Sequence, residues 1–547
     1  MYSTKILLIK LKFNFLTNIS KNLSRSSVIC NFVLMIKNIQ LQVLPNQAAN
    51  SDLLLKVVSE KVDSKESSIK HIEILKKSID ARQKTTKINL IIDVYINESF
   101  TQKETNVPKY KDVNNAEEVI IVGAGPAGLF AALKLIENGK KPIILERGKD
   151  VKSRRMDIAK LSKEHIVNED SNYCFGEGGA GTFSDGKLYT RSKKRGDVNK
   201  ILDTLISHGA SHDIRVDAHP HIGTNKLPQI IQNIRETIIK YGGAIFFNSL
   251  VTDIIIKNKK VDGVVLQNDD VINAGKIILA TGHSARDIFE LLYQKEIEIE
   301  AKAFALGVRV EHTQELIDQI QYKCKSRGEY LPPAPYSIVK QVNGRGVYSF
   351  CMCPGGIIAP CATSPGEVVT NGWSPSRRDY ETSNSGIVVE LKVNDFAKYT
   401  DKGALAGMYF QKEIEHTAWK SAGKTQKVPA QRLVDFTNNK LSADIPNTSY
   451  FPGTTASKLS DILPKFVNDN LQEGFIQFGK QMKGYLTNEA IIHAPESRTS
   501  SPVRIPRDKD TLQHTQIKGL FPCGEGAGYA GGIISAAIDG EKCAEKC

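Results

Sequence analysis

The sequence predicts an α/β fold, and three observations support this prediction. First, an apolar run at 119–122 leads through a glycine-rich turn into a helical stretch at 126–138 and then into a second apolar run at 142–145. This order is typical of a βαβ unit with parallel strands. Second, a series of short strands separated by polar turns ends in a buried strand at 276–280. Third, residues 519–523 form another short apolar strand, which is followed by glycines and a helix.

The turn after the first strand has the sequence GAGPAG, from Gly123 to Gly128. Gly123 permits the tight turn, Gly125 allows the backbone to approach a pyrophosphate, and Gly128 allows the helix and the strand to pack closely. The N–H groups at the start of the helix attract phosphate oxygens. Glu146, at the end of the second strand, is placed to accept hydrogen bonds from ribose hydroxyls. The pattern predicts a dinucleotide site in a Rossmann-like domain.

Two later segments resemble the glutathione-reductase-like class of FAD flavoproteins. The apolar strand at 277–279 ends in Ala280-Thr281-Gly282, and the last strand continues into Gly524-Glu525-Gly526. In that class the last strand ends in Gly-Asp and its acid bonds the ribityl chain, a position that Glu525 occupies here. The resemblance implies FAD as the cofactor, with the helix after Gly531-Gly532 directing its N-terminus at the flavin.

Four longer motifs are similar to a family of uncharacterised bacterial FAD-dependent dehydrogenases. They are GEGGAGTFSDGKL at 176–188, HSARD at 283–287, FCMCPGG at 350–356 and GEGAGYAGGI at 524–533. The resemblance covers residues 35–547 and implies an FAD-dependent oxidoreductase, with no substrate attached to it. Together the motifs predict the following cofactor-binding residues: Gly123, Gly125, Pro126, Ala127, Gly128, Glu146, Arg147, Gly179, Gly181, Thr281, Gly282, Gly524, Glu525, Gly531, Gly532 and Ile533.

The glycine-rich loop at 176–188 does not follow a clear strand, so it is not a second copy of the nucleotide-binding turn. It either permits tight packing or lies along the flavin or its pyrophosphate. The sequence shows no second strand–turn–helix unit with the same glycine pattern. The electrons would therefore come from the substrate, or from NAD(P)H bound without that fold.

Three residues are candidates for catalysis, and none of them is supported by a motif. His283 follows Thr281-Gly282 and could approach the cofactor. Cys353, two residues after Cys351, is either a thiol that reacts with the flavin or a buried strand cysteine. Cys361 adds a third thiol but no fourth ligand is evident, so no metal site is expected.

The third candidate is Arg309, which can share one face of a predicted strand with Glu311. It would either hold a substrate carboxylate or belong to a solvated strand face. Arg498 and Arg504 precede the last strand and are alternative partners for anionic groups of the cofactor or the substrate.

Composition and charge narrow the class of protein. Nine cysteines at irregular spacing form no disulfide framework, which favours a reducing compartment and a cytoplasmic location. The formal net charge is +13, but no aromatic–basic motif of an RNA-binding module accompanies it. We expect no membrane span, because no charge-free apolar run is long enough. Residues 1–34 are basic and free of acids, and are either an N-terminal extension from a mis-assigned start or a targeting segment.

We expect a Rossmann-like FAD-binding domain that is interrupted by an inserted β-rich substrate domain and preceded by a small ferredoxin-like α/β unit. The expected bounds are 1–34 for the N-terminal extension, 35–112 for the small unit, 116–300 and 485–547 for the two parts of the FAD-binding domain, and 301–484 for the substrate domain.

The expected function is two-electron hydride transfer between flavin and a small organic substrate. One alternative is a flavin-dependent monooxygenase, which NADPH-dependent oxygen uptake would reveal. Another is a nucleic-acid-modifying flavoenzyme, which would bind RNA in a salt-sensitive manner. A third is a non-catalytic flavin-binding redox sensor whose N-terminal unit contacts a partner. No motif indicates the oligomeric state.

Overall fold

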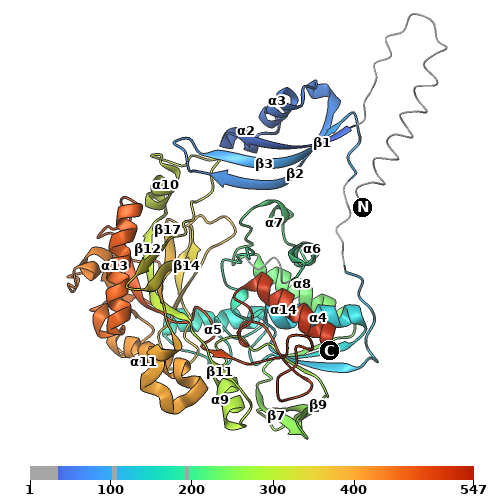
Figure 1. Cartoon of the computed structure of the whole chain (residues 1–547), viewed down its shortest axis with the longest axis vertical. Helices are drawn as coiled ribbons and strands as arrows, with labels where there is room; N and C mark the ends of the chain where they lie inside the picture. Colours follow the sequence, from blue (N-terminus) through green and yellow to red (C-terminus); the bar gives the residue numbers. More distant parts are fainter. Residues whose placement is uncertain (1–34, 102–107, 191–195) are drawn as a thin grey trace, which may run out of the picture.

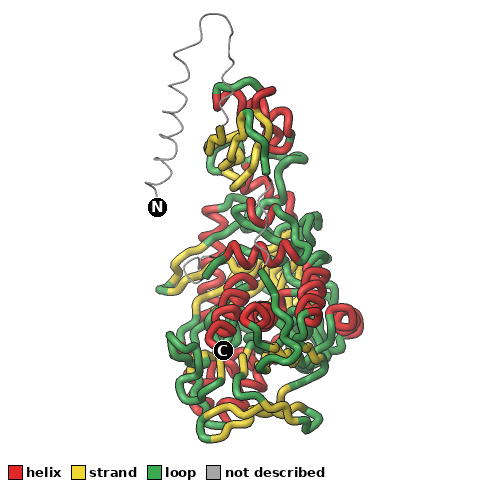
Figure 2. Tube along the Cα trace, turned by 90° about the vertical axis from the view of Figure 1, so that its right-hand side faces the viewer, coloured by secondary structure: helices red, strands yellow, loops and turns green. Residues whose placement is uncertain are grey.

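The structure is a computed structural model that describes residues 35–101, 108–190 and 196–547. Both interpretations of residues 1–34 concern residues outside these ranges. A small N-terminal unit projects from one end of a larger body (Figure 1), as the view turned by 90° also shows (Figure 2). Its strand β2 bridges to the body between Lys77 and Asp217. Within the described ranges, no helix is long and apolar enough to cross a membrane.

The N-terminal unit is a three-stranded antiparallel sheet with helices on one face. Alternate residues of its central strand, from Ile88 to Val94, are buried in the same core cluster as Leu54 and Val58 of the longer helix. The strand order β1-β3-β2 is that of the first three strands of a ferredoxin-like unit. The elements are β1 (Met35–Val43), α2 (Pro45–Ala49), α3 (Ser51–Val62), β2 (Ile69–Asp80) and β3 (Lys87–Ile96).

The centre of the larger body is a five-stranded parallel sheet with the order β22-β10-β4-β5-β6. Ile121, Ile144 and Ile278 pack against the helices α4, α6, α8 and α14 on one face. Their neighbours Ile120 and Ile143 pack against a three-stranded antiparallel sheet on the other face. The strands are β4 (Glu118–Val122), β5 (Lys141–Leu145), β6 (Ala244–Phe246), β10 (Ile277–Leu279) and β22 (Leu520–Pro522). The layers around them are α4 (Pro126–Asn138), α5 (Val151–Glu164), α6 (Val198–Ser207), α7 (Asp213–Val216), α8 (Leu227–Lys240), β7 (Val251–Lys257), β8 (Lys260–Leu266), β9 (Val271–Asn273), α9 (Arg286–Gln294) and α14 (Ile533–Lys546).

The inserted domain is built on a seven-stranded sheet with the order β13-β14-β17-β12-β20-β18-β19. Helices α10, α11 and α13 lie on the outer side of this sheet in Figure 1. The strands are β12 (Ala305–Thr313), β13 (Val339–Val342), β14 (Arg345–Cys353), β17 (Thr382–Glu390), β18 (Val428–Arg432), β19 (Thr454–Ala456) and β20 (Ile491–Glu496). The remaining elements are β11 (Glu300–Ala301), α10 (Gln314–Tyr322), β15 (Ile357–Pro360), β16 (Thr370–Trp373), α11 (Ala406–Ser421), α12 (Leu433–Thr437), α13 (Lys465–Gln481) and β21 (Val503–Arg504).

The inserted sheet extends beyond residue 484, where we expected the domain to end. β20 pairs with β12 on one side and with β18 on the other, so the chain leaves this sheet only after Glu496. A short apolar strand fits either sheet when it is read alone, and only its partners decide its place.

Candidate functional site

A cavity of about 400 Å³ lies where the parallel sheet meets the inserted domain. Its walls come from the segments that follow β4, β5 and β10, from the glycine-rich loop at 176–188, and from the start of α14. Phe350, Cys351 and Asn371 of the inserted domain complete the walls. The carboxyl ends of parallel strands are where open α/β sheets place ligands, so the cavity is the candidate functional site.

The turn between β4 and α4 is shaped by its glycines. Gly123 has a φ of +102°, in the left-handed region that disfavours a side chain. A Cβ on Gly128 would lie 2.0 Å from the carbonyl oxygen of Gly123, so only glycine lets the first turn of α4 pack this closely. The helix therefore begins directly at the cavity, where its free N–H groups favour an anion.

Glu146 ties three loops together beside this turn. Its Oε2 accepts a hydrogen bond of 2.8 Å from the backbone N–H of Ala124, and its Oε1 accepts bonds of 2.9 Å from the N–H groups of Gly148 and Gly176. The carboxylate is buried and lines the cavity. It therefore holds the nucleotide-binding turn and the glycine-rich loop in register, in addition to any contact with a ribose.

The glycine-rich loop lies against the nucleotide-binding turn. The N–H of Gly178 donates a 2.8 Å hydrogen bond to the carbonyl of Ala124. A Cβ on Gly179 would lie 3.1 Å from the Cα of Gly125. The loop packs tightly, as one interpretation expects, and it also lines the cavity with Gly179 and Gly181; contact with a flavin or pyrophosphate stays a prediction.

The structure brings together most of the residues predicted to bind the cofactor. Gly128 and Gly524 do not line the cavity: Gly128 packs on Gly123, and a Cβ on Gly524 would lie 2.9 Å from the Cβ of Ala127. The predicted residues that line the cavity are Gly123, Gly125, Pro126, Ala127, Glu146, Arg147, Gly179, Gly181, Thr281, Gly282, Glu525, Gly531, Gly532 and Ile533.

His283 and Glu525 face each other at the start of α14, with Nε2 and Oε1 4.0 Å apart. Burial, together with the positive charges of Arg498 and Arg286, lowers the pKa of His283 to about 4. The imidazole is therefore neutral at pH 7. Burial raises the pKa of Glu525 to about 7, although Lys302 opposes this shift. This end of the cavity thus holds a neutral imidazole beside a carboxyl group that titrates near neutrality.

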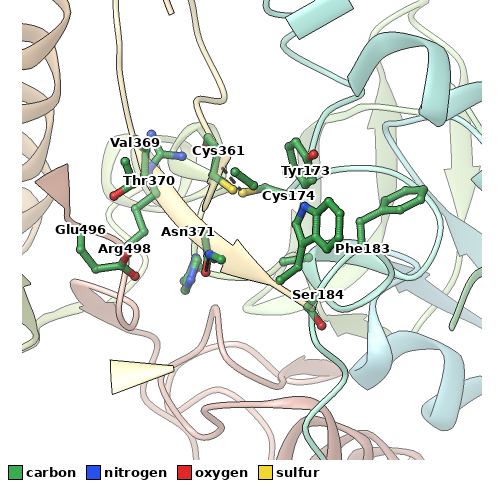
Figure 3. A pocket seen from close by; sticks show the side chains of 15 residues that line it. Tyr173, Cys174, Phe183, Ser184, Cys361, Val369, Thr370, Asn371, Glu496 and Arg498 are labelled. Atoms are coloured by element: carbon green, nitrogen blue, oxygen red, sulfur yellow. Dashed lines mark hydrogen bonds between the residues drawn. The ribbon is translucent and has the colours of Figure 1, made fainter. Parts of the chain in front are cut away.

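A smaller pocket of about 50 Å³ opens beside His283 and is shown in Figure 3. Tyr173 and Phe183 come to it from the nucleotide-binding side, and Glu496 and Arg498 come from the end of β20 and beyond (Figure 3). Trp373 of β16 also lines the pocket, which shares Cys174, Ala180, Ser184, His283, Asn371 and Arg498 with the large cavity.

Arg498 is saturated by neighbours of the protein itself. Its guanidinium donates to Glu367 at 2.7 Å, to Glu415 at 2.9 and 3.0 Å, and to the hydroxyl of Thr363 at 2.7 Å. Arg286 pairs with the same two glutamates at 2.7 and 2.9 Å. These four charged side chains join the nucleotide-binding body to α11, and they leave Arg498 no free edge for a substrate carboxylate. Arg504, the other arginine considered for this role, is half exposed and lies outside the lining of both cavities.

Arg309 does not reach either cavity, so the prediction that it holds a substrate carboxylate is not supported. It is fully buried in β12 and pairs with Glu496 at 2.7 Å. Its other nitrogens donate to Asn384 at 2.7 Å and to Asn371 at 3.4 Å. The alternative of a solvated strand face is wrong as well, because both faces of β12 are covered.

The two cysteines of the FCMCPGG motif have different places. Cys351 lines the large cavity, whereas Cys353 is fully buried and does not. The ammonium of Lys187 lies 3.7 Å from the sulfur of Cys351 and 3.5 Å from that of Cys353. We had not singled out Lys187, although it stands inside the predicted glycine-rich loop as part of Ser184-Asp185-Gly186-Lys187.

One buried trio has the geometry of a partial metal site among the described residues. Ligand atoms of Cys523, Asp539 and Cys543 lie within 4.8 Å of one another. Arg507, however, donates to both carboxylate oxygens of Asp539, at 2.6 and 3.0 Å, and lies 3.4 Å from the sulfur of Cys543. A guanidinium already occupies the position that a cation would need.

Two family models cover the nucleotide-binding and inserted parts of the chain. "Pyridine nucleotide-disulphide oxidoreductase" matches residues 117–320, and "FAD-dependent protein, C-terminal domain-like" matches residues 303–499. A domain of unknown function matches residues 35–95. An uncharacterized protein of Clostridium beijerinckii is 40% identical over 523 residues, which cover 91% of this chain and 97% of that protein. Thiamine thiazole synthase of Methanococcus vannielii is 27% identical over 195 residues, which cover 34% of this chain and 63% of the synthase.

Solved structures give weaker similarities. The glycine oxidase from Bacillus cereus is 15% identical and matches 80% of this chain and 94% of its own, with a TM-score of 0.29. The structure of CtdE in complex with FAD is 13% identical and matches 79% of this chain and 84% of its own, with a TM-score of 0.31. At these scores neither structure carries a conclusion about the site.

Proposed function

We propose that the large cavity holds FAD in an extended conformation. The chain belongs to the same family as the uncharacterized protein of Clostridium beijerinckii, and its family models are those of FAD-dependent oxidoreductases. The pyrophosphate would lie over the turn from Gly123 to Gly128, and the adenosine ribose would lie beside Glu146. The flavin would lie at the smaller pocket, between His283 and the inserted domain. The enzyme would transfer a hydride between the flavin and a small organic substrate held where that pocket meets the large cavity.

The observation that carries this proposal is the shape of the cavity walls. Cβ atoms added at Gly282, Gly531 and Gly532 would meet nothing within 4 Å, so bare backbone faces open space in the cavity. The start of α4 lies close to the start of α14, because a Cβ on Gly181 would lie 3.4 Å from Pro126 and 3.5 Å from Ile533, and it offers unpaired N–H groups for the pyrophosphate. A long ligand with phosphates in its middle and a flat ring at one end matches these walls.

When bound, FAD supplies the group that accepts or donates the electron pair. The residues of the chain would position it and control protons. The N-terminus of α14 would favour negative charge on the ring edge that it faces. His283 stays neutral and can donate or accept a hydrogen bond, and Glu525 can exchange a proton near pH 7.

The smaller pocket limits the class of substrate. Its aromatic walls, Tyr173, Phe183 and Trp373, favour a planar or apolar part of the substrate. The neighbouring cations Arg498 and Arg309 are already matched by glutamates, so both guanidinium groups that the structure describes beside the pocket are neutralised by the protein itself. We therefore propose a small substrate with a flat, uncharged reacting part.

The proposal is tested by the visible spectrum of the purified protein after addition of FAD, followed anaerobically as NADH or NADPH is added. A flavin spectrum that bleaches identifies a nicotinamide donor, and one that persists directs the search to the substrate as the donor. A strong oxygen uptake with NADPH would instead favour a monooxygenase. A protein that stays colourless after addition of FAD would overturn the proposal.

A matched pair of variants tests the placement of the cofactor. Glu146→Gln weakens the hydrogen bonds that hold the loops around the pyrophosphate, each worth about 1.5–3 kcal/mol to a charged acceptor. We expect FAD to bind at least roughly tenfold more weakly, whereas Glu164→Gln, at the exposed end of α5, should bind FAD as the wild type does. Equal FAD affinity of both variants would contradict this placement.

A further inference from the structure

Cys351 and Lys187 line the cavity, and the buried Cys353 lies beside the same lysine. β14 brings the two thiols from the inserted domain, and the glycine-rich loop brings Lys187 from the nucleotide-binding side. The ammonium lies within 3.7 Å of both sulfurs, which places the two thiols around one cation. Nothing in the proposed hydride transfer uses these three side chains.

The backbone at this position departs from a regular strand. The pairing of β14 with β17 shifts by one residue between Phe350 and Cys353, so β14 carries an extra residue. Cys351 has a φ of +47°, a left-handed conformation that is rare for a residue with a side chain. In a regular strand, residues two apart have Cα atoms about 6.6 Å apart, which is near the upper limit for a disulfide. The bulge and the left-handed residue depart from this regular geometry at the two cysteines.

The charges of the cluster require one more negative group. Lys187 lies 3.5 Å from Asp185, and Arg378 donates to the same carboxylate at 2.8 Å. Two cations thus share a single carboxylate among the residues that the structure describes. One ionised thiol beside Lys187 would neutralise the cluster.

The pKa values of the two thiols shift in opposite directions. A hydrogen bond from Cys353 lowers the pKa of Cys351 well below that of a free thiol, and the positive charge of Lys187 lowers it further against the effect of burial. The same hydrogen bond and burial raise the pKa of Cys353. Of the two thiols, Cys351, which lines the cavity, is therefore the one that ionises more readily.

We propose that Cys351 and Cys353 are a redox-active pair that exchanges two electrons with the flavin. This inference rests on the proposed position of FAD. In the oxidised form a single S–S bond joins the two sulfurs. When reduced flavin gives up its electron pair, this bond breaks, Cys353 takes up a proton, and Cys351 remains as a thiolate beside Lys187. In the opposite direction the dithiol forms the disulfide again, and oxidised flavin accepts the electron pair.

The pair differs from cysteines that only fill a core. A buried structural thiol lies among apolar side chains and stays protonated. Here the neighbours are charged, Cys351 faces open space, and the backbone adopts a costly conformation, of the order of 1–3 kcal/mol, that natural proteins concentrate at functional sites. Cys324, at the end of α10, provides a contrast, because it packs against the apolar core.

The experiment counts the electrons that the FAD-loaded protein takes up in an anaerobic titration with dithionite. If the proposal holds, the wild type takes up two electron pairs per flavin, one for the ring and one for the disulfide. Cys351→Ser and Cys353→Ser each take up one pair per flavin, and the control Cys324→Ser takes up two. A wild type that binds FAD and takes up only one pair overturns the redox pair and leaves the proposed function standing.

A second measurement does not depend on bound flavin. Mild oxidation of the FAD-free protein with diamide, followed by proteolysis and mass spectrometry, should show a peptide that contains both cysteines and has lost two hydrogen atoms. The background variant Cys361→Ser removes the third thiol of that peptide. Thiols that both remain free to alkylation after diamide overturn the proposal, and a protein that forms this disulfide but never binds FAD overturns the proposed function instead.

Discussion

The ion-pair cluster that joins the two domains predicts that the substitution Glu415→Gln strongly lowers the free energy of unfolding. Glu415 is fully buried, and two arginines, Arg286 and Arg498, donate to its carboxylate at 2.9–3.0 Å. Burial alone would raise the pKa of Glu415, but the two arginines overcome it and lower the pKa from 4.5 to about 2. A difference of this size corresponds to roughly 3 kcal/mol of stability, at about 1.4 kcal/mol for each pH unit.

The sign of the effect sets its pH range. Because the folded protein holds this carboxylate ionised, the stabilisation is present above the unfolded pKa of 4.5 and is lost as the pH falls toward 2. Glutamine cannot neutralise the arginines at any pH. We therefore expect Glu415→Gln to lower the free energy of unfolding by roughly 3 kcal/mol at pH 7, in the range measured for broken buried ion pairs. The loss should shrink progressively below pH 4.5.

The assay is chemical denaturation followed by tryptophan fluorescence. The chain has two tryptophans, and both Trp373 and Trp419 lie in the inserted domain, with Trp419 on the same helix as Glu415. The control is Glu413→Gln on that helix, where the half-exposed carboxylate pairs with Lys398 and the expected change is below about 1 kcal/mol. A loss at Glu415 smaller than about 1 kcal/mol, or equal to that of the control, would refute the electrostatic argument.

Three further predictions address the cavity. Lys187→Met should slow alkylation of Cys351 by iodoacetamide at pH 7 by roughly tenfold or more, because the thiolate loses its cation. Lys187→Arg should restore part of the rate. Unchanged labelling would contradict the role of the ammonium. Gly128→Ala should lower both the free energy of unfolding and the affinity for FAD, because its Cβ would meet the carbonyl of Gly123 at 2.0 Å. The expected overpacking cost is about 1–3 kcal/mol. A variant as stable as the wild type would show that the turn can move. His283 should stay neutral down to about pH 5, so NMR of its ring nitrogens should show no protonation between pH 6 and 8. Protonation in that range would contradict the burial and the nearby positive charges that lower its pKa.

The parts of the fold that could be predicted are those where the signal is local. The turn from Gly123 to Gly128, the strands at 277–279 and 520–522, and the start of α14 all carry glycines or apolar runs next to one another in sequence. The family matches and the parallel sheet confirm the FAD-dependent class and the Rossmann-like fold. The loop at 176–188 was also identified from its composition, although sequence alone left its role between packing and ligand contact.

The parts that could not be predicted depend on partners that are distant in the chain. Arg309 and Glu311 look like a solvated strand face, and only the pairing of β12 with both β17 and β20 shows that they are buried. The place of β20 in the inserted sheet could not be predicted for the same reason, because it depends on pairing with β12 and β18. Lys187 and the two cysteines lie far apart in sequence, and no spacing rule connects a lysine in a glycine-rich loop to thiols on a strand of another domain.

The charges around the two cavities follow a common pattern with one exception. Arg286 and Arg498 are matched by two glutamates, and Arg309 is matched by Glu496, so these groups are neutral as sets whether or not a ligand is present. The charge of such a neutral set does not need to change when the flavin is reduced. The cluster of Lys187, Arg378 and Asp185 has one positive charge more than its carboxylate can match, and it stands at the thiols. The net charge of this cluster depends on whether the neighbouring sulfur is a thiolate or part of a disulfide. We therefore expect the thiol pair, and not the arginines, to store a second electron pair.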